Sequence, residues 1–167
     1  MRALVTVASK HGATAEIGES LAQRLRERGV DVEVLPPEVV GSAAGYDAVI
    51  IGSAVYAGHW MKSATEFVQR QADTLRDRAV WLFSSGPLGE PPVPAGDAVE
   101  VDGLVRQVSA VGHRVFSGAL ERAQLGFGER AIVGLVRAPY GDFREWDAID
   151  SWADEIAEMI ATPATAH

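Results

Sequence analysis

Short apolar runs alternate along this chain with segments whose apolar residues recur at helical spacing. Three runs contain few charged residues and are typical of strands buried on both faces of a sheet; they lie at 3–8, 46–53 and 79–84. A fourth segment, 30–35, alternates apolar and charged residues as an edge strand does. A fifth strand is predicted at 114–120.

Four other segments place apolar residues three or four positions apart, which predicts amphipathic helices. Their approximate ranges are 15–28, 61–75, 101–108 and 146–160. In the first of them Ile17, Leu21 and Leu25 form the apolar stripe, and Gly29 follows where a helix C-cap is expected.

Strands that alternate with helices pair in parallel through right-handed crossovers. The pattern therefore predicts an α/β fold of three layers, with helices on both faces of a five-stranded parallel sheet. We expect a single domain over residues 1–162 and a C-terminal tail, 163–167. The segment 121–142 is longer than an ordinary connection between two elements.

The composition, 47% hydrophobic and 23% charged, is that of a globular domain. A net charge of −8 disfavours nucleic acids and anionic membranes as partners. It suits a basic protein partner or a small cofactor, unless it serves solubility alone. No stretch approaches the ~20 apolar residues of a transmembrane segment. The absence of cysteine excludes disulfides and cysteine nucleophiles, and it is compatible with a cytoplasmic protein.

Ligands of open parallel sheets bind outside the carboxyl ends of the strands, where the loops 9–14, 53–60 and 84–96 are expected to meet. In the first loop Gly12 allows an anion to approach the backbone closely, and the helix that follows favours negative charge at its N-terminus. Thr14 is either a phosphate ligand or a plain helix N-cap. The candidate phosphate-binding residues are Ser9, Lys10, His11, Gly12, Ala13 and Thr14.

The second loop is rich in small residues and then aromatic, a composition that can hold a planar ring. Its candidates are Ser53, Ala54, Val55, Tyr56, Ala57 and Gly58, with Tyr56 placed for stacking. His59 is either a hydrogen-bond donor to a reduced ring or an ordinary surface histidine, and Trp60 is assigned to the core. The third loop offers Ser84, Ser85, Gly86 and Pro87, unless it is an ordinary Gly-Pro turn.

Other ligand chemistries lack their motifs. No G-x-G-x-x-G and no P-loop follows the first strand, which disfavours dinucleotides and nucleoside triphosphates. A phosphorelay receiver needs acidic residues at the end of that strand, where this chain has Val7, Ala8 and Ser9. No nucleophile elbow and no histidine cluster with metal spacing is present.

The run Ser9-Lys10-His11-Gly12-Ala13-Thr14 resembles the phosphate loop of flavodoxins, and 46–53 resembles their third strand. Flavodoxins are themselves a standard instance of binding at the edge of a parallel sheet. The segments 52–59, 66–68, 117–120 and 142–147 are similar to the branch that contains the menaquinone-dependent protoporphyrinogen oxidases. The resemblance covers nearly the whole chain. It implies a doubly wound flavodoxin-like fold, strand order 2-1-3-4-5, and FMN as the cofactor.

Two departures from the family pattern bear on function. His11 stands where the family has Thr, so one phosphate-binding hydroxyl is missing, and Lys10 can compensate. The insertion 121–142 is shorter and less basic than in the oxidases, which weakens the expectation of a quinone-linked activity at a membrane.

Three functions follow from these patterns. The first is an FMN-binding carrier that passes electrons between protein or small-molecule partners. The second is an oxidoreductase of the protoporphyrinogen oxidase type, which acts on a porphyrinogen-like substrate and a quinone. The third is a binding module that has kept the fold and lost the flavin. No residue is singled out as catalytic, and no metal site is predicted.

Overall fold

The computed structural model describes residues 1–10, 12–56, 58–86, 100–116, 119–120, 141–142 and 144–162. The strands are β1 (Arg2–Ala8), β2 (Asp31–Leu35), β3 (Ala48–Tyr56), β4 (His59–Trp60), β5 (Ala79–Ser85), β6 (Gly112–Phe116), β7 (Ala119–Leu120) and β8 (Gly141–Asp142). The helices are α1 (Ala13–Glu27), α2 (Lys62–Arg76), α3 (Val101–Val108) and α5 (Trp146–Ala161), with a short 3₁₀ helix η1 (Pro37–Val39). These four helices of the described residues lie within two residues of their predicted bounds.

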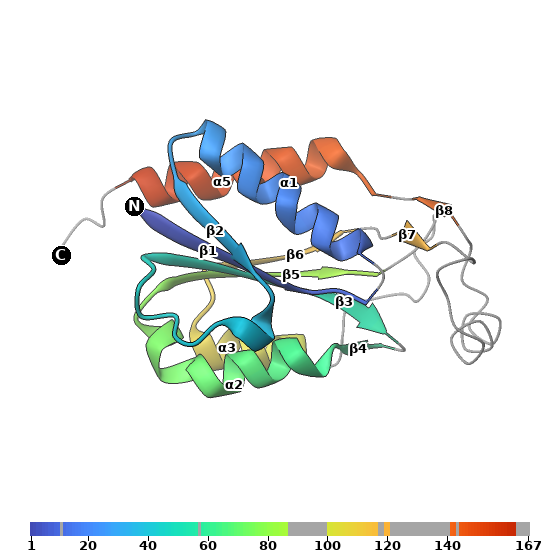
Figure 1. Cartoon of the computed structure of the whole chain (residues 1–167), viewed down its shortest axis with the longest axis horizontal. Coiled ribbons are helices and arrows are strands. Elements are labelled where there is room, and N and C mark those ends of the chain that lie inside the picture. The colour runs from blue at the N-terminus through green and yellow to red at the C-terminus, as the bar shows by residue number, and fades with distance from the viewer. Residues whose placement is uncertain are drawn as a thin grey trace.

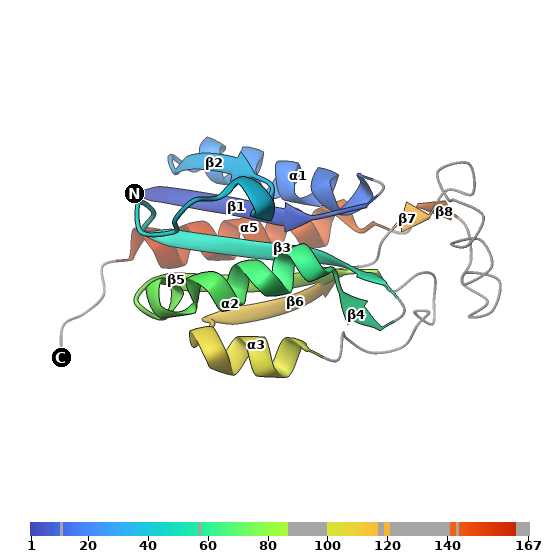
Figure 2. The same ribbon diagram turned by 60° about the horizontal axis from the view of Figure 1, so that its bottom comes forward.

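The main sheet has the order β2-β1-β3-β5-β6, and every neighbouring pair along it is parallel. Without the short β4, this is the order 2-1-3-4-5 that the resemblance implied. Figure 2 shows these strands side by side. One row of the register joins Val5, Ile50 and Trp81 across three strands.

Helices α1 and α5 cover one face of the sheet, and α2 and α3 cover the other (Figure 1). Strand residues such as Val5 and Ile50 pack toward α1 and α5 in one apolar cluster. Their neighbours Leu4 and Val49 point the other way and pack toward α2 and α3. The uninterrupted apolar runs therefore form strands buried on both faces, as their pattern predicts.

The segment expected to be the second loop is largely a hairpin. β3 continues to Tyr56 because Ser53 and Ala54 still pair with β5. The chain then turns at Gly58, whose φ is +81°, and β4 pairs antiparallel with the end of β3. Interpreting 53–60 as a loop was therefore wrong in its local structure, since small and aromatic residues also suit a tight strand pair.

The fifth strand begins and ends earlier than predicted. β6 ends at Phe116, which pairs with Ser85, the last residue of β5. Residues 117 and 118 of the predicted strand lie outside the described residues. Ala119 and Leu120 pair instead with β8 in a separate two-stranded sheet. Most of the insertion 121–142 and the tail 163–167 lie outside the described residues.

A cluster of aromatic rings fills the core near the carboxyl edge of the sheet. The ring centroids of Phe83 and Phe116 lie 5.9 Å apart, and Trp152 of α5 lies 6.0 Å and 5.4 Å from these two rings. Gly52 on β3 makes room for this cluster, because a Cβ atom there would lie 2.1 Å from the Phe83 ring. The cluster gives the carboxyl edge a rigid apolar floor.

Candidate functional site

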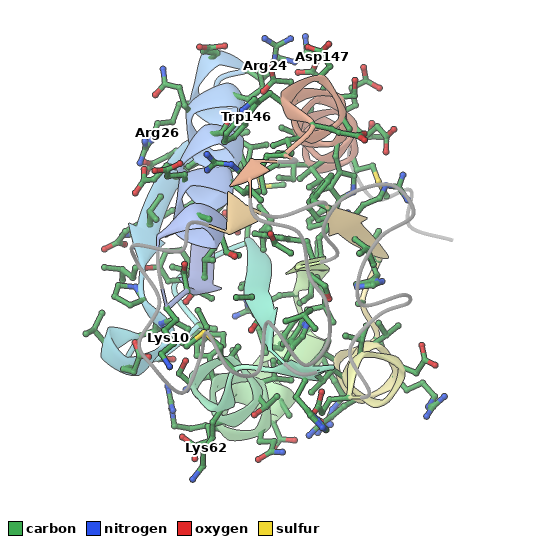
Figure 3. The ribbon with its side chains drawn as sticks, turned by 90° about the vertical axis from the view of Figure 1, so that its right-hand side faces the viewer. Lys10, Arg24, Arg26, Lys62, Trp146 and Asp147 are labelled. Atoms are coloured by element: carbon green, nitrogen blue, oxygen red, sulfur yellow. The ribbon has the colours of Figure 1, made fainter. Side chains whose placement is uncertain are left out.

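Three connections meet at the carboxyl edge of the sheet, where its order reverses. β1 lies between β2 and β3, so the chain leaves it toward one side and returns on the other. The carboxyl-terminal parts of β1, β3 and β5 lie side by side, since Ala8 pairs with Ser53 and Ser53 pairs with Ser84. Figure 3 looks onto this edge, with Lys10 on the side of α2 and Trp146 on the side of α1 and α5. Such a switch point is where open α/β sheets bind ligands.

In the first connection, 9–14, the conformation of the backbone, and not a capping side chain, sets where α1 begins. Gly12 is the N-cap residue and has a left-handed φ of +87°. The hydroxyl of Ser9 accepts a hydrogen bond of 3.1 Å from the Gly12 N–H. No side chain in the described part of the chain caps the helix. The first-turn N–H groups of α1, which a helix cannot pair itself, therefore point toward the edge of the sheet.

Thr14 is not the N-cap, because α1 already begins at Ala13. Its side chain is buried in the first turn, with 4% of its surface exposed. This removes the plain N-cap as the explanation for Thr14. His11 lies outside the described residues, so its part in this connection stays a prediction.

The hydroxyl of Ser53 closes the hairpin at the second connection. It donates to the carbonyl of Ala54 at 2.8 Å and accepts from the N–H of Met61 at 2.9 Å. Trp60 is buried, as predicted, and its indole Nε1 donates to the Ser84 hydroxyl at 2.8 Å. The second and third connections are thus joined by a buried hydrogen bond.

Glu100 fastens the same hairpin from the start of α3. One carboxylate oxygen lies 2.6 Å from Nδ1 of His59, and the other accepts from the Trp60 N–H at 3.2 Å. Burial acts to raise the pKa of Glu100, but hydrogen bonds from His59 and from backbone N–H groups outweigh it and lower that pKa. Sequence reasoning missed Glu100, since nothing local in an acidic residue before a helix indicates a partner 41 residues away.

At the third connection the two serines differ. Ser84 accepts from Trp60, whereas the Ser85 hydroxyl is buried and has no hydrogen-bond partner among the described residues. Gly86 lies against the hairpin, because a Cβ atom there would be 2.8 Å from Cβ of Val55. Pro87 and Ala57 lie outside the described residues.

Arg144 is a second residue that sequence reasoning missed. It precedes α5, yet its guanidinium donates to the carbonyl of Ala13 at 3.3 Å and pairs with the carboxylate of Glu16. It also stacks on Trp146, 4.7 Å from the ring centroid. No motif indicates this contact, which spans 131 residues of sequence.

The described residues fit a phosphorylated planar ligand. The uncapped start of α1 offers N–H groups to an anion, and among the described residues, apart from the chain neighbours of Gly12, no atom lies within 4 Å of the space that a Cβ there would take. The unpartnered hydroxyl of Ser85 is a buried donor at the same edge, and native proteins rarely leave such a group unpaired. These features suit FMN, whose phosphate would meet 9–14 and whose flavin would meet the other two connections.

Among the described residues, no group of three or more His, Cys, Asp or Glu side chains is placed to hold a metal ion. No helix in the described part is both long and apolar enough to cross a membrane.

Known proteins resemble this chain in sequence and in fold. The model of the family described as "Flavodoxin domain" matches residues 4–147. A protein named protoporphyrinogen IX dehydrogenase (quinone), from Escherichia coli strain K12, is 24% identical, with 98% of each chain covered.

Two solved flavodoxins share the fold. One from the domain Archaea has a TM-score of 0.67 and 14% identity, covering 97% of this chain and 100% of its own. One from Streptococcus pneumoniae TIGR4 has a TM-score of 0.63 and 18% identity, covering 95% and 99%.

Proposed function

The chain belongs to the flavodoxin-domain family, and we propose that it carries electrons between redox partners through FMN held at the carboxyl edge of the sheet. Members of this family are FMN-binding flavoproteins, so the chain is a redox protein of the FMN type. The observation that supports the proposed site best is the start of α1. There Gly12 caps the helix in a left-handed conformation and leaves the first N–H groups to a ligand.

In this proposal different segments of the chain bind the phosphate and the ring of FMN. The phosphate is held by Ser9, Gly12 and Thr14 with the backbone of 10–14, and the ring lies between 53–58 and 84–87. The hydroxyls of Ser53 and Ser84 are engaged within the protein, so we expect them to shape the hairpin, and the backbone beside them to face the ring. When bound, FMN supplies one- and two-electron transfer, and the protein tunes it through burial and charge.

A spectrum and a redox titration test the carrier function. The purified protein should be yellow and release FMN on denaturation. Reduction of the bound flavin should proceed in two separate one-electron steps, because a carrier between one-electron partners must hold the half-reduced state. A single two-electron step like that of free flavin contradicts the carrier, and a colourless protein that does not take up added FMN supports the flavin-free module.

The likeness to the Escherichia coli dehydrogenase favours a second candidate, oxidation of a porphyrinogen with a quinone as acceptor. The alignment covers 98% of both chains, so it includes the insertion 121–142. Turnover of protoporphyrinogen IX with a menaquinone analogue would establish this activity. A flavin-loaded protein that exchanges electrons with dyes and gives no turnover in this assay is a carrier.

A further inference from the structure

The guanidinium of Arg144 occupies an unusual position at the start of α1. It bonds to the carbonyl of Ala13, the first residue of the helix and the neighbour of the N-cap Gly12. Only 11% of its side chain is exposed, whereas Glu16 beside it is 64% exposed. The guanidinium also lies over the ring of Trp146, 4.7 Å from the ring centroid. The guanidinium of Arg144 is therefore held beside the first turn of α1.

A cation at this position works against the helix. The N-terminus of a helix carries about half a positive charge, so arginine is disfavoured there and glutamate is favoured. Burying a guanidinium adds a desolvation cost, which pairing offsets only in part. Glu16, the acidic partner of Arg144, is exposed, so water screens its charge more than that of the guanidinium. Arg144 thus places a largely buried positive charge beside the start of α1, on a chain whose net charge is −8.

We propose that Arg144 is a positioning residue that makes the cofactor site selective for a phosphorylated flavin. It fixes the first turn of α1, so that the N–H groups aim at the phosphate, and it adds positive potential beside a dianion. This inference rests on the proposed FMN function. The competing explanation is that Arg144 only ties the segment before α5 to α1, in which case it stabilises the fold and does not distinguish one flavin from another.

Three variants of the full-length protein separate these explanations when FMN and riboflavin are titrated by flavin fluorescence quenching. Arg144→Gln removes the charge, Arg144→Lys keeps it without the planar fork, and Glu16→Gln removes the balancing acid. Arg78→Gln is the matched control, because Arg78 precedes β5 at the opposite edge of the sheet and bonds to the carbonyl of Ala44.

We expect Arg144→Gln to weaken FMN binding about tenfold and riboflavin binding less than twofold. Arg144→Lys should fall between this variant and the wild type. Glu16→Gln should tighten FMN about threefold and leave riboflavin unchanged, an effect that higher salt reduces. Glu16→Gln retains Arg144 and its contact with Trp146, so it tests the charge even if Arg144→Gln folds poorly.

Equal weakening of both flavins by Arg144→Gln, or an FMN affinity that Glu16→Gln does not change, overturns the proposal. So does an Arg78→Gln protein that loses FMN affinity as much as Arg144→Gln does. Failure of the wild type to bind FMN at all refutes the proposed function itself. FMN binding by the wild type is therefore measured before any variant is compared with it.

Discussion

The proposed phosphate loop, residues 9–14, and the β3–β4 hairpin, residues 53–60, lie at the same edge of the sheet and are built in opposite ways. The backbone shapes the phosphate loop: Gly12 takes a left-handed conformation, and the N–H groups that follow have no capping side chain. Side chains close the hairpin: the Ser53 hydroxyl accepts from the Met61 N–H, and the Trp60 indole donates to Ser84. The Glu100 carboxylate accepts from the Trp60 N–H. In our proposal the N–H groups of the first region bind a ligand, whereas the polar side chains of the second bond within the protein.

This difference predicts two kinds of failure. Changes in the phosphate loop should affect FMN and spare riboflavin, because only FMN carries the phosphate. Changes in the hairpin should alter fold stability and affect both flavins alike. The ratio of FMN affinity to riboflavin affinity therefore reports which region a substitution has damaged.

The largest effect is expected from Gly52→Ala, which disturbs the base of the hairpin. The new Cβ atom would lie 2.1 Å from the Phe83 ring, and Phe83 is fully buried among other aromatic rings. We expect the free energy of unfolding to fall by about 3 kcal/mol, measured by urea denaturation. Both flavins should bind more weakly and by similar factors.

The matched control for that change is Gly41→Ala, because no atom lies within 4 Å of a Cβ there. Its free energy of unfolding should stay within about 0.5 kcal/mol of the wild type. A Gly52→Ala protein as stable as this control would show that the Phe83 ring moves aside freely.

Gly12→Val tests the backbone of the phosphate loop. The φ of +87° is strained for any β-branched residue, at a cost of about 1–3 kcal/mol, which corresponds to roughly five- to hundredfold weaker FMN binding. Gly12→Asn should retain more affinity, since asparagine tolerates the left-handed region. Fluorescence titration measures both variants. Equal affinities for FMN in Gly12→Val and Gly12→Asn would contradict a role for this conformation.

Trp60→Phe tests the closure of the hairpin. It keeps the apolar ring but removes the donor to Ser84 Oγ, so we expect a loss of about 1 kcal/mol in the free energy of unfolding. Ser84→Ala made in the Trp60→Phe background should cost less than in the wild type, because the partner is already gone. The ratio of FMN to riboflavin affinity should not change. Strictly additive costs would mean that the hydrogen bond contributes nothing.

The smallest expected effect is on how the stability of the fold depends on pH in the acidic range. The pKa of Glu100 is held below its ordinary value of 4.5, so its contribution to stability is present above that value and is lost as the pH falls through the lowered pKa. Glu100→Gln removes this dependence. Between about pH 6 and pH 3 the variant should lose less thermal stability than the wild type does.

Glu66→Gln is the matched control for that experiment. Glu66 is 55% exposed and lies 3.6 Å from Lys62, so its loss removes one carboxylate without opening the hairpin. It should follow the wild type as the pH is lowered. A Glu100→Gln profile that coincides with the Glu66→Gln profile would show that the contact between His59 and Glu100 adds nothing in acid.

Most of the fold could be predicted from the sequence, since strands buried on both faces leave an unmistakable apolar pattern. The strand order came from the family resemblance, and the phosphate loop came from Gly12 before a helical segment. The hairpin was missed, because Val55 and Trp60 pair through backbone geometry that side-chain types do not reveal.

The contacts of Glu100 and Arg144 could not be predicted at all. Both join elements that are far apart in sequence, and only the folded chain brings them together. Residue type was also an incomplete guide to role: Ser53 and Ser84 have the hydroxyls that a ligand would need, and the fold uses both of them. A site made from helix geometry is thus easier to predict than one whose polar side chains also bond to each other.

The most direct test of the phosphate loop is calorimetric titration of the wild type and Thr14→Ala with FMN and with riboflavin. Thr14 lies buried in the first turn of α1, and a hydroxyl bonded to a charged phosphate contributes about 1.5–3 kcal/mol. FMN should therefore bind about ten- to hundredfold more weakly to the variant, while riboflavin binding should hardly change. Thr14→Ser, which keeps the hydroxyl, should restore most of the FMN affinity. Equal weakening of FMN and riboflavin by Thr14→Ala would contradict the assignment of this loop to the phosphate.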